Sequence, residues 1–156
     1  MHAVFCLLPV KHIQICSLTF TYSCCTTQTT AVTSCAAEMK SWAKNSGYDK
    51  PTFCLINMAS NQVASNGKGG IMGALLMKLA RSLEIDKDSD ISVFEKHFKK
   101  RVVVLVLDEI DMLFKQHGGA GETCFRTLID LAERTELKFS LIGISNCVND
   151  ANAARV

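Results

Sequence analysis

Residues 101–113, RVVVLVLDEIDML, constrain the fold of this chain more than any other segment. The six apolar residues 102–107 are too few to cross a membrane and have no helical periodicity. They predict a strand that is buried on both faces of a parallel sheet. Asp108 and Glu109 follow directly, at the end of the strand where ligands of open α/β sheets bind. This pair predicts a site for a cation or a reacting water, although acids also stabilise helix N-termini without any ligand.

Strand-like and helix-like segments alternate along the chain, with turn residues between them. The first strand is predicted to lie within residues 13–22, without exact bounds. This alternation, with aliphatic strands, indicates an α/β fold with three layers and a mainly parallel sheet. Strands are predicted at 13–22, 52–58, 102–107 and 138–144, and helices at 31–43, 71–83, 92–100 and 122–133. Cys35, Met39 and Trp42 share one face of the first helix, and a loop is predicted around Gly118, Gly119 and Gly121.

Three segments resemble one protein family. The string VLVLDEIDML (104–113) looks like the Walker B segment of AAA+ ATPases, a class of P-loop NTPases. Within that class it most resembles the DNA replication initiators, namely the largest subunit of the origin recognition complex and the cell division control protein of the six type. FSLIGISNCVND (139–150) is similar to their sensor 1 strand, and TFCLINM (52–58) is a weaker match to the strand after the first helix. The resemblance covers residues 29–150 and implies an incomplete AAA+ core.

The resemblance also implies roles for individual residues. Asp108 would hold the Mg²⁺ of bound ATP, Glu109 would polarise the attacking water, and Asn146 would contact the γ-phosphate. Thr30 matches the last part of the phosphate loop, so it is implied as a nucleotide ligand. An alternative for Asn146 is a turn residue, because asparagine favours strand ends. Asp111 is interpreted as a cap of the following helix and not as a metal ligand.

The phosphate loop of such enzymes is missing. Its pattern, G-x-x-x-x-G-K-[ST], supplies backbone N–H groups and a lysine to the phosphates. The aligned residues 24–31 read CCTTQTTA, with Thr29 in the place of the lysine and Gln28 and Thr26 in the places of glycines. The string GKGG (67–70) has the wrong spacing and is interpreted as a flexible turn. Weak nucleotide binding is therefore predicted.

These observations divide the chain into a divergent segment, 1–28, and a partial AAA+ core, 29–156. The implied parent function is ATP-dependent origin binding and helicase loading in the nucleus. Its partners would be other initiator AAA+ subunits, the replicative helicase, and double-stranded DNA contacted through domains absent from this chain. Three alternatives stay open: a non-catalytic AAA+-like interaction module, an AAA+ ATPase of another subfamily such as a clamp loader, and a wrongly joined first segment in place of a normal loop.

Composition narrows the class of protein. With 156 residues, 48% of them apolar, the chain is predicted to form one globular domain. The net charge of +2 argues neither for nor against nucleic acid, and the basic run KHFKKR (96–101) is interpreted as a helix end. No membrane partner is expected, since no segment approaches the length of a transmembrane helix. The eight cysteines include no C-x-x-C pair, so free intracellular thiols are predicted, with Cys54 and Cys124 facing the core.

Overall fold

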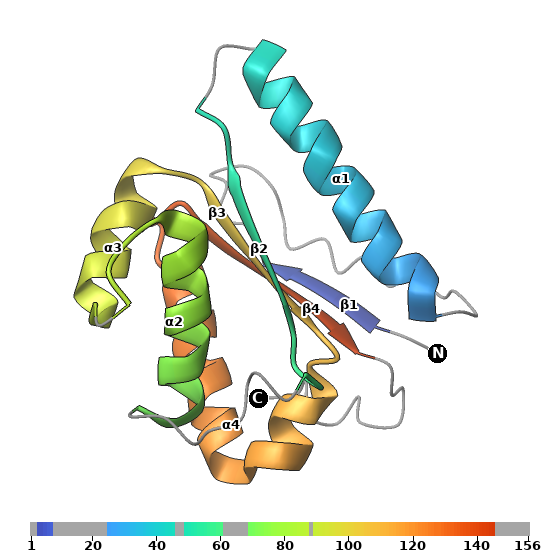
Figure 1. Cartoon of the computed structure of the whole chain (residues 1–156), viewed down its shortest axis with the longest axis vertical. Helices are drawn as coiled ribbons and strands as arrows, with labels where there is room; N and C mark the ends of the chain where they lie inside the picture. Colours follow the sequence, from blue (N-terminus) through green and yellow to red (C-terminus); the bar gives the residue numbers. More distant parts are fainter. Residues whose placement is uncertain (1–2, 8–24, 46–48, 61–68, 88, 146–156) are drawn as a thin grey trace.

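The computed structural model describes residues 3–7, 25–45, 49–60, 69–87 and 89–145. Within them the chain forms one sheet with strand order β1-β4-β3-β2, together with helices that pack on it (Figure 1). The strands are β1 (Ala3–Leu7), β2 (Thr52–Asn57), β3 (Val103–Asp108) and β4 (Phe139–Ser145). The helices are α1 (Cys25–Asn45), α2 (Gly70–Leu83), α3 (Ile91–Lys100) and α4 (Asp111–Glu133).

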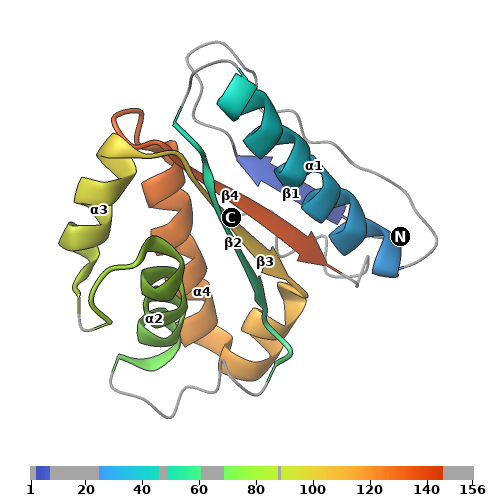
Figure 2. The ribbon, with the colours of Figure 1, turned by 45° about the horizontal axis from the view of Figure 1, so that its top comes forward.

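The predicted α/β class is confirmed. Strands β2, β3 and β4 are parallel neighbours, whereas β1 pairs antiparallel with β4 at the edge of the sheet. Helix α1 lies over one face of the sheet, and α2, α3 and α4 lie over the other (Figures 1 and 2). The antiparallel strand Ala3–Leu7 was not predicted, and the predicted first strand at 13–22 lies outside the described residues.

Burial of β3 on both faces agrees with its apolar sequence. Val103, Leu105 and Leu107 belong to the large core under α2, α3 and α4, whereas Val104 and Val106 pack on the side of α1. All five are at most 2% exposed. The strand begins one residue later than predicted, because Val102 is 37% exposed and precedes the ladder.

Helix α1 presents a different face from the one predicted. Cys35, Met39 and Trp42 were predicted to share one face of this helix, but Cys35 and Met39 are exposed, Met39 to 42%. The side chain of Trp42 lies outside the described part of the structure. Ala36 and Ala43 are buried instead, and the partly buried Val32 packs against the sheet. These three lie on one helical face because they are spaced by four and seven residues. The prediction failed because it followed the larger side chains, whereas small alanines let the helix approach the sheet.

Helix α4 is longer than predicted. A loop was expected around its glycines, with a helix only from 122 to 133. Instead the helix begins at Asp111 and continues through a break at Gly118, where φ is 48° and ψ is −128°. After the break Gly121 lies against the preceding turn, because a Cβ there would be 2.3 Å from the carbonyl oxygen of Leu113. The glycines therefore make a kink with close backbone packing and not a loop.

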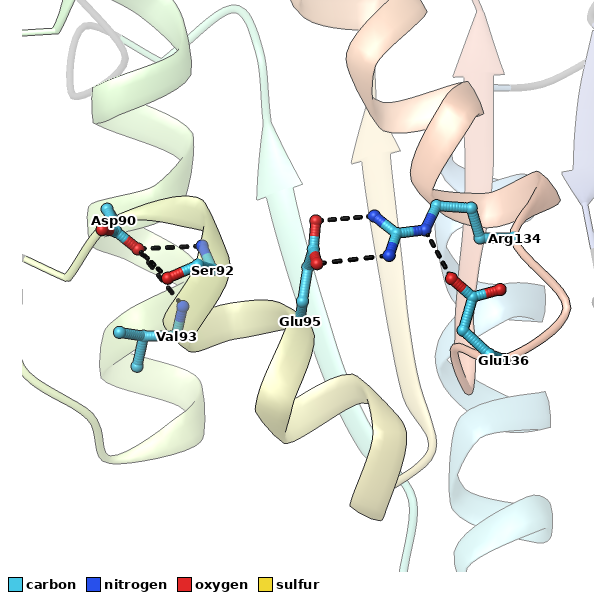
Figure 3. Close-up of polar contacts among 6 residues, drawn as sticks. All are labelled: Asp90, Ser92, Val93, Glu95, Arg134 and Glu136. Atoms are coloured by element: carbon cyan, nitrogen blue, oxygen red, sulfur yellow. Dashed lines mark hydrogen bonds and ion pairs between the residues drawn. The ribbon is translucent and has the colours of Figure 1, made fainter.

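Helix α3 is held at its N-terminus and in its middle by identifiable contacts. Its N-cap, Asp90, accepts hydrogen bonds from the backbone N–H groups of Ser92 and Val93 (Figure 3). Farther along, Glu95 forms a two-point ion pair with Arg134, at 2.6 and 3.2 Å, which ties α3 to the connection between α4 and β4 (Figure 3). These contacts orient the segment that leads into β3.

Candidate functional site

The carboxyl ends of the three parallel strands meet at one edge of the sheet. The register pairs Asn57 of β2 with Asp108 of β3, and Asp108 with Ile144 of β4. Two backbone hydrogen bonds of 2.9 Å extend this row, from the N–H of Met58 to the carbonyl of Asp108 and from the N–H of Ile110 to the carbonyl of Ile144. Strand alternation places Asp108 on the α1 side of the sheet, like Val104 and Val106.

Asp108 and Glu109 form a sharp turn between β3 and α4. Both are partly buried, and the N–H of Glu109 donates to Oδ1 of Asp108 at 3.0 Å. Glu109 has a φ of 55°, a left-handed conformation that is uncommon for residues other than glycine. Such backbone conformations persist where the surrounding structure determines them, and they cluster at functional sites. Sequence patterns gave no signal for this conformation.

Asp111 has a different role from the predicted cap. The N-cap of α4 is Ile110, which makes no side-chain capping hydrogen bond. Asp111 is only 8% exposed and accepts a hydrogen bond from the hydroxyl of Ser145 at 3.4 Å. It also forms an ion pair with Lys115 at 3.1 Å, one helical turn further on. The residue therefore connects the start of α4 to the last residue of β4.

The glycine of the sensor-like string Gly143-Ile144-Ser145 has a packing reason. A Cβ at Gly143 would lie 3.0 Å from Cδ1 of Ile110, the residue that follows Glu109. The small residue lets Ile110 pack over β4. The glycine in the sensor-like string is thus explained by packing between β4 and the turn after β3, without any ligand.

The segment aligned with a phosphate loop does not have the structure of one. Helix α1 already begins at Cys25, so residues 25–31 are helical, and Thr30 is an exposed residue within that helix. Beyond the first turn, backbone N–H groups of a helix bond inside the helix and cannot cradle phosphates. Together with the missing lysine and glycines, this means that the residues present do not fit the phosphates of ATP.

The fit to Mg²⁺ is partial. Mg²⁺ is held by one or two carboxylates together with the phosphates of a bound nucleotide, and Asp108 offers one such carboxylate. Among the residues that the structure describes, no group of three or more His, Cys, Asp and Glu side chains could hold a metal ion. The predicted site residue Asn146 lies outside the described residues, directly after Ser145.

A shallow groove lies elsewhere, between α1 and the sheet. Its volume is about 270 Å³, and it is lined mostly by apolar side chains, including Val32, Phe53 and the half-exposed Leu55. Lys40 borders it, with Nζ 5.4 Å from the centre of the Phe53 ring. Asp108 and Glu109 do not line this groove, so it is separate from the acidic pair.

The cysteines with described surroundings are free thiols, namely Cys35, Cys54 and Cys124. The prediction that Cys54 and Cys124 face the core is confirmed. Burial raises the pKa of both thiols, that of Cys124 to about 11, although a hydrogen bond from Ser82 partly opposes the effect at Cys54. Neither buried thiol is a nucleophile at neutral pH, because the thiolate is the reactive form.

The described part of the chain contains no helix that combines the length and the apolar character needed to cross a membrane. Comparison with known proteins adds no relationship: no protein-family model matches the chain, and neither a curated protein nor a solved structure is significantly similar to it.

Proposed function

We propose that this chain is a partial AAA+ ATPase core of the DNA replication initiator type, impaired in nucleotide binding. The observation that carries the proposal is the position of Asp108 and Glu109. They lie at the carboxyl tip of β3, between the parallel strands β2 and β4, in the turn that leads into α4. A ligand site of an α/β sheet is expected at that edge. The string DEIDML and the sensor-like strand then favour an AAA+ initiator over other α/β proteins.

We propose the same residue roles as those that the resemblance implies. Asp108 is the proposed Mg²⁺ ligand, Glu109 the proposed acid for the reacting water, and Asn146 the proposed sensor. The helical backbone at 25–31 opposes tight ATP binding by this chain. Its proposed contribution is therefore to assemblies with other initiator AAA+ subunits and the replicative helicase in the nucleus.

A second candidate is a non-catalytic AAA+-like interaction module. The helix in place of a phosphate loop is the specific observation in its favour, because it leaves the acidic pair without the groups that would present a phosphate to it. In this case Asp108 and Glu109 serve only to shape the turn into α4.

Nucleotide binding by the isolated chain tests the proposal directly. A fluorescent ATP analogue is titrated at physiological salt, with and without Mg²⁺, into the wild type and the Asp108→Ala variant. Weak or absent binding is expected. Asp130→Ala, which removes an exposed acid farther along α4, is the matched control. Affinity in the low micromolar range or tighter, lost in Asp108→Ala and kept in the control, would show that the site is intact.

A restored protein distinguishes the two candidates. Residues 1–28 are replaced by a strand and a phosphate loop with its lysine, and partner initiator subunits are present in the assay. Asp108→Asn should weaken Mg²⁺-dependent binding. Glu109→Gln should leave binding nearly intact and slow turnover about 10²-fold, the contribution expected of one general base. Turnover equal to that of the restored parent would favour the non-catalytic module, as would failure to bind ATP at all.

A further inference from the structure

Exposed cations gather at the edge of the sheet opposite the acidic pair. They come from three separate segments: the approach to β2, the junction of α3 with β3, and the residue before β4. Figures 1 and 2 show the starts of these strands and the end of α3 at the same end of the molecule. We call this set the basic edge, and its members are Lys50, Lys99, Lys100, Arg101 and Lys138, all exposed.

The strand register determines the spacing within the basic edge. Thr52, Val103 and Phe139 form one row across the three parallel strands. Lys50 and Arg101 therefore each precede this row by two residues and Lys138 precedes it by one, on strands about 4.8 Å apart. Lys50, Arg101 and Lys138 therefore lie at the starts of three successive strands of the sheet, whereas Lys99 and Lys100 come from the last turn of α3.

Contacts with α3 complete the arrangement. The N–H of Lys138 donates to the carbonyl of Phe98 at 2.7 Å, and its Nζ donates to the carbonyl of Lys100 at 3.4 Å. These bonds place Lys138 beside the last turn of α3. Favourable interaction with the helix dipole explains cations in that last turn, but it does not explain Lys50 or Lys138, which lie outside the helix.

The acids near the basic edge only partly offset its charge. Glu136 is bonded to Arg134 at 2.8 Å, and Arg134 in turn holds Glu95, so this trio adds one negative charge (Figure 3). Asp49 adds a second, Glu133 at the end of α4 a third, and Glu84 at the C-cap of α2 a fourth. Arg81, in the last turn of α2, adds one more positive charge at this end. The five cations of the basic edge and Arg81 therefore exceed these four negative charges by two.

We propose that the basic edge binds the phosphate backbone of nucleic acid without reading its sequence. Side-by-side cations neutralise phosphates and release counterions, which drives sequence-independent binding. An anionic membrane fits less well, because binding to a membrane surface is strengthened by bulky apolar side chains that enter the lipid. Within the described residues, the only large apolar side chain exposed next to the basic edge is Val102. This surface lies in the chain itself and needs neither the acidic pair nor ATP.

Binding of labelled nucleic acid tests this proposal. Fluorescence anisotropy is measured with a double-stranded and a single-stranded oligonucleotide of random sequence, over a series of salt concentrations. The test variant is Lys99→Gln/Lys100→Gln/Lys138→Gln. The control variant, Lys87→Gln/Lys115→Gln/Arg126→Gln, removes the same charge from exposed positions outside the basic edge. Circular dichroism and thermal unfolding check that both variants are folded.

The wild type and the control should bind at low salt, and the test variant should bind about tenfold or more weakly. For duplex DNA, the slope of log K against log salt should become shallower by about 0.9 for each phosphate that the variant no longer neutralises. Three results would each overturn the proposal: no binding by the wild type at low salt, an equally large decrease in the control, or binding to phosphatidylserine vesicles without binding to nucleic acid.

Discussion

The hydroxyl of Ser145 donates to the buried carboxylate of Asp111 across 3.4 Å, which joins the last residue of β4 to the first residue of α4. A backbone hydrogen bond of 2.9 Å, from Ile110 to Ile144, lies beside it. Together these bonds hold the turn that follows β3 against the strand that leads to the predicted sensor residue. The turn that contains Asp108 and Glu109 is thus connected to the strand that precedes Asn146 by residues that have no proposed role in the site.

Removal of the Asp111 carboxylate should destabilise the fold. Asp111→Ala leaves the buried hydroxyl of Ser145 without this acceptor, and such a change costs about 1–3 kcal/mol. Urea unfolding followed by circular dichroism measures the change. Lys115→Ala is the control. It removes the ion pair by deleting the Lys115 side chain, which is 47% exposed, and it leaves the Asp111 carboxylate in place. The control should change the free energy of unfolding by less than about 1 kcal/mol. Equal destabilisation of the two variants would argue against a role for the bond to Ser145.

Two glycines of α4 should respond oppositely to alanine. At Gly121 the added Cβ meets the carbonyl oxygen of Leu113 at 2.3 Å, so the backbone must move, and destabilisation by about 1–3 kcal/mol is expected. At Gly119 nothing lies within 4 Å of the added Cβ, and alanine should stabilise the helix by about 0.4–1 kcal/mol. Thermal and urea unfolding of the two variants provide the comparison. A stabilising Gly121→Ala would show that α4 has no close turn at this position.

Burial of Cys124 should make stability fall at alkaline pH. Because its pKa is raised by burial from 9.0 to about 11, the unfolded chain loses the thiol proton first. The free energy of unfolding should therefore decrease between about pH 9 and pH 11, relative to the Cys124→Ala variant. Unfolding by urea at several pH values gives both curves. A constant difference between the two proteins across this range would contradict the buried environment of the thiol.

The ion pair between Arg134 and Glu136 should be visible in the titration of Glu136. A hydrogen bond from the Arg134 side chain lowers the pKa of this carboxyl below its usual 4.5, aided by a backbone hydrogen bond and nearby positive charge. Because the folded pKa is depressed, the contribution of the pair to stability is present above pH 4.5 and is lost as pH falls below it.

Carbon-detected NMR of the glutamate carboxyls measures this pKa. In Arg134→Gln it should rise toward the ordinary value, whereas Lys87→Gln, far along the chain, should leave it unchanged. If Glu136 titrates identically in the wild type and Arg134→Gln, the ion pair does not form in solution.

Local sequence patterns were sufficient to predict the elements whose apolar residues follow a clear period. Strand β3 was predicted to within one residue because five buried aliphatic residues in a row allow only a strand with two covered faces. Helix α2 was predicted equally closely, since Ile71, Leu75, Leu79 and Leu83 repeat on one face and all are buried. The position of the acidic pair was likewise predicted from the sequence, because Asp108 and Glu109 directly follow the apolar residues of β3 in the chain.

Features that depend on what a residue packs against could not be predicted from local patterns and are seen only in the folded chain. The buried face of α1 depends on how closely a helix can approach the sheet, which favours Ala36 and Ala43 over larger neighbours. The kink at Gly118 depends on the contact of Gly121 with an earlier turn, whereas the glycines by themselves predict a loop. The link between Asp111 and Ser145 joins residues 34 positions apart, and no local pattern encodes such a contact. Such contacts stabilise the fold only after the sheet has brought the distant segments of the chain together.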